Sequence, residues 1–304
     1  MSAVAGAAGA HLGWNVADDV RQMFAYHFMV NAFWAGTIVA VVAGAIGWLM
    51  VLRRQTFAGH TLAVVGFPGA SGAAWLGIGL GWGYFGFCVA AAAVLAAVPR
   101  PETSEGFSEE SAVVGTVQAF ALACGFLFTS LTGSFLNGIS ALLFGTFLGI
   151  TDGQVVVLAL VGGSTLLVAA VIGRRLFFAS VDADVARARR LPVRALSAVF
   201  LLLLGLATAE VSQITGSLLV FAILVMPAAA AQRLTARPSV SVAVTVALAL
   251  AVTWLGLAAA YFSVYPVGFF VTTLAFVAYV AVVAISSGRE RLGHRPAKAM
   301  AAPA

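Results

Sequence analysis

Charged residues are scarce in this chain. Asp, Glu, Lys and Arg together make up 9% of its 304 residues, whereas 62% are hydrophobic, and lysine occurs once, as Lys298. Soluble domains carry about 25% charged residues, so a water-soluble fold would lack the polar surface needed to cover so large an apolar core. The composition therefore predicts a polytopic membrane protein.

Motifs of nucleotide-hydrolysing and membrane-bound enzymes are absent as well. The sequence contains no GxxxxGK[ST] phosphate-binding loop, no HExxH, no Cys-x-x-Cys and no GxSxG. Its two cysteines, Cys88 and Cys124, lie within apolar stretches, where small packing residues are more typical than a disulfide. We therefore expect a chain that is not an enzyme, hydrolyses no ATP itself and holds no permanent cofactor.

Long apolar stretches dominate what is present. Each is close to the roughly 20 residues that cross a bilayer as a helix, and none shows the short polar and apolar alternation of transmembrane β-strands. We predict an all-α membrane protein, a polytopic bundle of about nine transmembrane helices (eight to ten). The run 139–148 is too short to span and is predicted to be re-entrant or interfacial. The nine stretches cover about 28–51, 61–80, 82–98, 111–131, 155–172, 195–211, 214–231, 239–261 and 267–285.

The basic residues predict the orientation, because Lys and Arg collect on the cytoplasmic side of short loops. With the N-terminus outside, Arg21 alone of the sixteen falls on the outer side. We expect a multi-pass protein of the inner (cytoplasmic) cell membrane with a cytoplasmic C-terminus. Its parts would be an external tail at 1–27, a transmembrane domain at 28–286 and a cytoplasmic tail at 287–304. The net charge of +5 then reflects this topology and attraction to anionic lipid, not nucleic-acid binding.

A charged segment, residues 173–194, separates two of the apolar stretches. Acidic residues would lie in the first turn of a short helix near 180–191 and arginines in its last turn, which matches the helix dipole. Ser180 is the expected cap and Pro192 the expected end. The residues alone leave two interpretations: a basic loop on anionic lipid, or a docking helix for a cytoplasmic partner. The helix residues expected at a partner are Asp182, Asp184, Val185, Arg187, Arg189, Arg190 and Leu191.

The stretch FFASVDADVARARRLPVR, residues 177–194, resembles the F-D-x-x-x-A-x-x-x-x-x-P-V segment of permeases of the zinc, manganese and iron ABC importer family. Further stretches are similar to motifs of that family in the same order, namely AGTIVAVVAGAIGWLMVLRRQTFAGHTLA, ISALLFG, TGSLLVFAILVMPAAAAQRL and YPVGFF. The resemblance implies an ABC importer permease, which is the membrane subunit that forms the translocation path. It also implies a separate cytoplasmic ATPase docked on a coupling helix at 180–191, an external substrate-binding protein, a homodimer and a transported divalent metal.

Ionisable residues inside apolar stretches are candidates for contact with a substrate, because burying them in a membrane is costly. Two such residues lie in or next to the stretches, namely Glu210 and, just before the stretch 61–80, His60; Gln213 follows close behind Glu210. His60 stands where the family has Asp, and Val64 stands where it has His, so this chain lacks the family's Asp and His pair. We expect His60 and Glu210 to contact the metal. The alternatives are a helix-entry histidine bonded to the backbone and a carboxylate that reaches interfacial water.

Two prolines within apolar stretches are further candidates for the path. Pro68 lies among three glycines in GFPGASG, and Pro227 lies in LVMPAAAA. Each is compatible with a kinked, closely packed helix or with an opened helix whose carbonyls line a path. Near the outer mouth, His11, Asp18, Asp19 and His27 could loosely gather a cation, with a flexible polar tail as the alternative.

Two other functions stay open at this point. An ion-gradient-driven secondary transporter would use His60 or Glu210 as a proton relay, although such relays normally need several ionisable groups in series. An ABC permease whose cargo is not a bare metal ion is compatible with the missing Asp and His pair. The residues do not distinguish zinc from manganese or iron, because imidazole and carboxylate suit several of these ions.

Overall fold

The computed structural model describes residues 16–97, 106–132, 142–143, 145, 149–217 and 219–293, and every element within them is helical. The run 139–148 falls mostly outside these residues, as do His11 and most of the C-terminal tail. The helices are α2 (Val16–Phe24), α3 (His27–Leu52), α4 (Thr56–Leu76), α5 (Leu80–Ala97), α6 (Gly106–Thr132), α8 (Asp152–Val181), α9 (Ala183–Ala188), α10 (Val193–Thr215), α11 (Val220–Leu234), α12 (Pro238–Tyr261) and α13 (Val267–Gly293).

The long helices match the predicted spans in order, which confirms the predicted all-α membrane bundle. Seven of them are long and apolar enough to cross a bilayer, and α4 and α11 are the two others. Helix α11 begins six residues later than predicted, because Gly216 ends α10 with a positive φ of 74°. Its 15 residues reach about 22 Å, which is less than the roughly 30 Å thickness of the hydrocarbon core.

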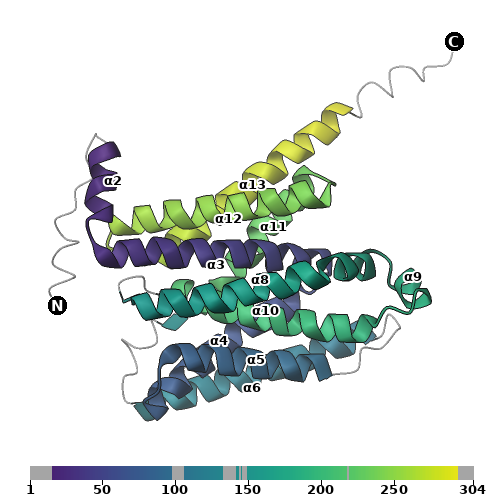
Figure 1. The fold of residues 1–304 in the computed structure, drawn as a ribbon, viewed down its shortest axis with the longest axis horizontal. Coiled ribbons are helices and arrows are strands. Elements are labelled where there is room, and N and C mark those ends of the chain that lie inside the picture. The colour runs from purple at the N-terminus through teal and green to yellow at the C-terminus, as the bar shows by residue number, and fades with distance from the viewer. Residues whose placement is uncertain are drawn as a thin grey trace.

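The helices run side by side, and α9 projects at one end of the bundle, at the right of Figure 1. Helix α2 and the start of α3 lie at the opposite end (Figure 1). The end with α9 is called the α9 end below. Arginines gather there, at the α3–α4 connection, around α9 and between α11 and α12, and among the described arginines Arg21 of α2 lies at the opposite end.

Helices α3 and α10 form the centre of the bundle. In each of them 67% of the most apolar stretch is buried, against 33% or less in the other five candidate spans. Small residues in α3 allow this burial, since neighbouring backbones can approach closely only where no bulky side chain intervenes. Gly44 lies against Val246 of α12, and Gly47 lies against the backbone carbonyl of Leu224 in α11.

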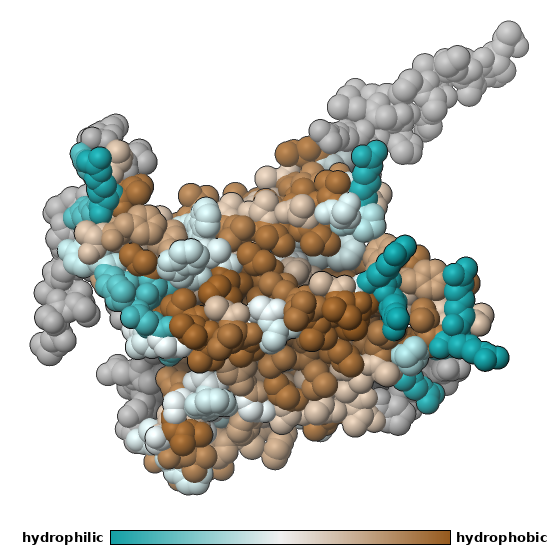
Figure 2. Space-filling model, in the orientation of Figure 1, coloured by the Kyte–Doolittle hydropathy of each residue, from teal (hydrophilic) through white to brown (hydrophobic). Residues whose placement is uncertain are grey.

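The outer helices expose apolar side chains to the surroundings of the bundle. On α8, Leu160, Leu167 and Val171 are largely exposed, and this face forms a hydrophobic band across the middle of the molecule with hydrophilic residues towards its ends (Figure 2). Helix α8 has 30 residues, about 45 Å of helix, so it extends beyond the hydrocarbon core. This length places α9 outside the apolar band.

The proline and glycine segment of α4 is a close packing site. Helix α4 continues without a break through Pro68, so the structure has the packed helix and not the opened one. Gly69 and Gly83 face each other across α4 and α5, and a Cβ on either glycine would collide with the carbonyl of the other. Pro227 likewise lies within the continuous helix α11 and is buried.

This contact yields a stability prediction. Gly83→Ala should destabilise the protein by about 1–3 kcal/mol, because its Cβ would push against the backbone of α4 rather than against a movable side chain. Gly86→Ala, in the same helix α5, is the matched control, since a Cβ there meets nothing within 4 Å. Thermal unfolding in detergent measures both. Equal midpoints for the two variants would contradict the close approach of α4 and α5.

Candidate substrate path and coupling helix

His60 lies near the start of α4, at the α9 end, and is half-buried. Its ring packs edge-on against Phe221 of α11, with ring centroids 5.2 Å apart. The imidazole makes no hydrogen bond to the described part of the chain, which differs from the expected alternative of a histidine bonded to the backbone. Within the described residues, the contact that positions the His60 ring is therefore the apolar one with Phe221.

Glu210 is fully buried in α10, and neither of its carboxyl oxygens has a hydrogen-bond partner among the described residues. The expected alternative of a carboxylate reaching interfacial water is therefore wrong, because α3 and α8 cover this side chain. Gly162 of α8 makes room for it: a Cβ at Gly162 would lie 3.2 Å from Oε1 of Glu210, and close to Val42 and Ile38 of α3. The carboxyl group thus sits in largely apolar surroundings, where an unpartnered polar group is costly.

The sequence candidates do not converge on one site. Gln213 faces Gly81 at the start of α5, while Glu210 faces α8 and α3. His60 lies at the α9 end and Glu210 within the last two turns of α10, towards the opposite end. Within the described residues, no group of three or more His, Cys, Asp or Glu side chains could hold a metal ion. The geometry therefore offers separate single contacts rather than a closed metal cage.

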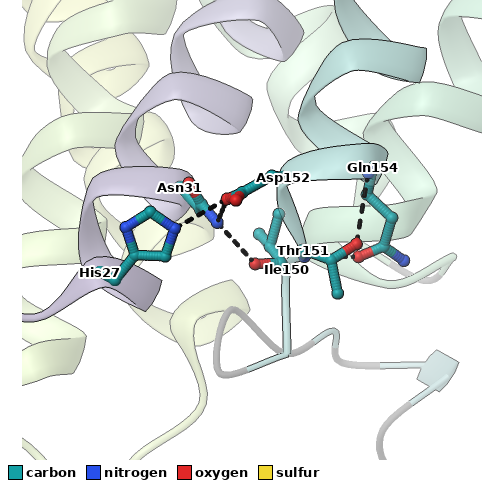
Figure 3. Close-up of polar contacts among 6 residues, drawn as sticks. All are labelled: His27, Asn31, Ile150, Thr151, Asp152 and Gln154. Atoms are coloured by element: carbon teal, nitrogen blue, oxygen red, sulfur yellow. Dashed lines mark hydrogen bonds and ion pairs between the residues drawn. The ribbon is translucent and has the colours of Figure 1, made fainter.

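A polar cluster at the opposite end was missed by sequence reasoning (Figure 3). His27 lies 2.8 Å from Oδ1 of Asp152, and Asn31 donates to the same oxygen at 2.7 Å and to the carbonyl of Ile150 at 3.1 Å. An ionised carboxylate only accepts, so Nε2 of His27 carries the proton. His27 therefore pairs with Asp152 in the structure, and this pair ties the start of α3 to the start of α8.

One local sequence pattern could have predicted the start of α8, and with it the position of Asp152. Thr151 and Gln154 form a capping box, in which the Thr151 side chain accepts from the Gln154 N–H and Gln154 accepts from the Thr151 N–H (Figure 3). The pattern T-x-x-Q before an apolar run is typical of a helix start. It would have placed Asp152 in the first turn of α8, three residues before the predicted span.

The helix predicted near 180–191 is present as α9 (Ala183–Ala188) and is shorter than expected. Asp182 caps it by accepting from the N–H of Val185 at 2.9 Å. Ser180 is therefore not the cap, because α8 continues past it to Val181 and keeps it inside the helix. The helix ends before Pro192, since Arg190 has a φ of 58° and the Leu191 N–H bonds to the carbonyl of Ala186, a left-handed C-terminal motif.

Helix α9 turns different residues inward and outward. Ala186 is fully buried and Leu191 packs against the core, whereas Val181 and Val185 are 65% and 43% exposed. Val185 and Leu191 thus do not share one apolar face. Arg187 forms an ion pair with Asp184 at 3.2 Å, and the Arg189 guanidinium lies 5.6 Å from the ring centre of Phe178. The helix is held by its inner face and presents valines and charges outward.

The model of one protein family, the ABC 3 transport family, matches residues 25–286. The chain belongs to the ABC 3 transport family. This confirms the resemblance seen in the sequence motifs, and the matched range runs from just before α3 into α13.

Two relatives of this ABC 3 family chain have names that describe transport proteins. It is 31% identical over 134 residues to the chelated iron transport system membrane protein YfeC of Yersinia pestis, which is 44% of each chain. It is 25% identical over 191 residues to the manganese import system permease protein ScaB of Streptococcus gordonii, covering 63% of this chain and 67% of the relative. The alignments thus span about half to two thirds of these relatives.

The fold is also that of a solved structure, PsaBC from Streptococcus pneumoniae in complex with Fab. The TM-score is 0.78 at 23% identity, with 88% of this chain and 95% of the other covered. At this identity the likeness establishes the fold alone. The ABC 3 family chain therefore has a known architecture, into which His60, Glu210 and α9 can be placed.

Glu210 yields a stability prediction for this ABC 3 family chain. Glu210→Met should stabilise it by about 1–3 kcal/mol, because it removes a buried carboxyl group without a hydrogen-bond partner while keeping similar volume. Thr165→Val, which removes a buried hydroxyl that also has no partner among the described residues, is the control and should have a smaller effect. Thermal unfolding in detergent tests both, and a lower midpoint for Glu210→Met would show that the carboxyl group is paired.

Proposed function

We propose that the chain is the membrane-spanning permease subunit of an ATP-driven importer for divalent transition-metal ions. It would act with a separate cytoplasmic ATPase, an external substrate-binding protein and a second copy of itself. The observation that carries this proposal is α9, a short, exposed and charged helix between α8 and α10, in a chain of the ABC 3 transport family. A segment of this kind can receive motion from a partner outside the membrane.

The distribution of arginines supports an orientation for this assembly. Basic residues gather at the α9 end, where an ATPase would dock, and basic residues favour the cytoplasmic side. The α9 end would therefore face the cytoplasm, with α2 and the His27–Asp152 pair outside in contact with the binding protein. Val185 and the charged residues on the outer face of α9, with Val181 at the end of α8, would form the surface that contacts the ATPase.

The candidate path residues suit a cargo that passes through quickly. A transport site must release its ion as well as bind it, and His60 would offer a single imidazole ligand next to Phe221. The names of two relatives refer to manganese and to chelated iron. Manganese and iron are compatible with sparse imidazole, carboxylate and carbonyl ligands, and a chelated ion would need fewer protein ligands still.

The separation of His60 and Glu210 weighs against a gradient-driven mechanism. A proton relay requires ionisable groups in series, whereas these two residues lie towards opposite ends of the bundle. The described apolar spans hold no third carboxylate or histidine between them. An ATPase acting on α9 is therefore the better-supported energy source.

Uptake measurements test the cargo. The chain, reconstituted with its ATPase and binding protein, should take up Mn²⁺ or Fe²⁺ in an ATP-dependent manner, with Zn²⁺ measured in parallel. His60→Ala should lower the rate about tenfold, as expected when one ligand contact is lost. Gly86→Ala, which adds a Cβ that meets nothing within 4 Å, is the control variant and should leave the rate unchanged. ATP-dependent docking without uptake of any free ion would indicate a chelated or non-metal cargo, and uptake without ATPase would favour the secondary transporter.

Docking of the ATPase tests α9. Val185→Asp should weaken ATPase binding roughly tenfold or more, because it puts an unpaired charge into the apolar part of the contact. Val264→Asp makes the same change at a valine that is 95% exposed, between α12 and α13 at the opposite end, and should leave ATPase binding unchanged. Binding of purified ATPase to the chain in nanodiscs measures both. Equal affinities would remove α9 from the docking surface.

A further inference from the structure

Arg53, at the end of α3, connects three helices through its side chain. One terminal nitrogen of its guanidinium donates to the Ser180 hydroxyl in α8 at 2.8 Å, and the other donates to the Ser197 hydroxyl in α10 at 2.6 Å. The guanidinium carbon also lies 5.2 Å from the ring centre of Phe200 in α10. A guanidinium presents its donors in a rigid planar fork, so the two serines are held at a defined separation.

The two serines flank α9 in the chain. Ser180 lies in the last turn of α8, two residues before the cap of α9, and Ser197 lies in the first turns of α10. The Ser180 hydroxyl also donates to the carbonyl of Leu176, so its own proton is used and its oxygen accepts from Arg53. Arg53 therefore links the end of α8 and the start of α10, on either side of α9, to the end of α3.

The last two turns of α3 are in turn bonded to other helices. Trp48 donates its indole N–H to Ser241 of α12 at 2.8 Å, and its carbonyl accepts from the Gln232 side chain, in α11, at 2.9 Å. The Trp48 ring stacks on Phe177 of α8 with centroids 6.1 Å apart, and Gly47 touches the backbone of α11. The end of α3 thus joins α8, α10, α11 and α12 at one level of the bundle.

We propose that Arg53 is a positioning residue for energy coupling. It holds the end of α8 and the start of α10 to α3, so that a displacement of α9 moves α3 and the helices bonded to it. This inference rests on the proposed function, in which an ATPase acts on α9. Without Arg53, the ends of α8 and α10 lose their shared link to α3 and separate when α9 is displaced, and ATP hydrolysis then proceeds with little transport.

The decisive quantity is the number of metal ions taken up per ATP hydrolysed, measured in proteoliposomes with equal amounts of assembled complex. Arg53→Ala should lower this ratio by about tenfold, the factor that corresponds to one charge-assisted hydrogen bond, while ATP hydrolysis and its KM stay near wild type. A purely structural role would instead lower the amount of assembled complex. Arg53→Lys should give an intermediate ratio, because one ammonium group does not reproduce the fork.

Two further variants keep the test independent of folding defects. Arg54→Ala changes the neighbouring exposed arginine and should leave the ratio unchanged. The pair Ser180→Ala with Ser197→Ala keeps Arg53 and its charge, and should reproduce the loss seen in Arg53→Ala. Adding Arg53→Ala to this pair should then cause no further loss. An unchanged ratio in both Arg53→Ala and the serine pair would overturn the proposal.

A failure of the proposed function would be seen separately, as absence of ATP-dependent uptake by the wild type. In that case the link itself is still tested by hydrogen exchange of the purified chain in detergent. Arg53→Ala should speed exchange at the end of α8 and the start of α10, whereas Arg54→Ala should not. Equal exchange in these segments for the two variants would show that Arg53 does not hold them and would overturn the proposal.

Discussion

Close approach of helix backbones is the constraint on which this bundle depends. Lipid provides no hydrophobic drive between helices, so they associate through packing and hydrogen bonds at short range. Gly47 lets α11 approach α3 until a carbonyl occupies the space of a side chain, and Gly69 with Gly83 does the same for α4 and α5. Because α11 lies so near, Trp48 can bond to Gln232. This contact between α3 and α11 therefore follows from a missing side chain one residue before Trp48.

Helix α3 is tied to α8 at both ends, but by contacts of different character. At the opposite end the His27–Asp152 pair is exposed, with 76% and 73% of the two side chains accessible, and exposed ion pairs contribute little to stability. At the α9 end the link is the half-buried Arg53, which reaches both α8 and α10. The His27–Asp152 contact can therefore open at little cost. The hydrogen bonds of Arg53, in contrast, favour movement of α3, α8 and α10 as a unit.

The spans could be predicted from the sequence because a bilayer demands a nearly fixed length of apolar helix. The boundaries failed where other forces decide them. Helix α8 runs nine residues past the predicted end at 172, since LFFASV continues a good helical sequence beyond the apolar core. The start of α11 was misplaced because a single positive φ at Gly216 ends α10. In each case the local backbone, not the hydrophobicity, determines the end.

The polar contacts were harder to predict than the spans. His27 and Asp152 lie 125 residues apart in the chain, and Arg53 lies 127 residues from Ser180. Serine is common in membrane helices and carries no signal of its own partner, so such links follow only from the packing of helices. The separation of His60 from Glu210, in contrast, follows from the order of the helices alone. His60 lies near the start of α4, at the α9 end. Glu210 lies near the end of α10, a helix that starts at the α9 end and runs away from it.

Glu210 is a buried side chain whose shape fits the packing but whose polarity is costly for stability. Its carboxyl group fills space that Gly162 leaves open between Val42 and Ile38, so the packing accommodates its shape. No described residue forms a hydrogen bond with its carboxyl oxygens, so within the described residues this buried polar group has no partner. A side chain kept only for packing would be apolar, since Met fills similar volume without the cost of desolvation. Residues that break a local rule without a compensating contact tend to be functional, so the cost of Glu210 to stability is the reason that it stays a candidate for contact with the cargo.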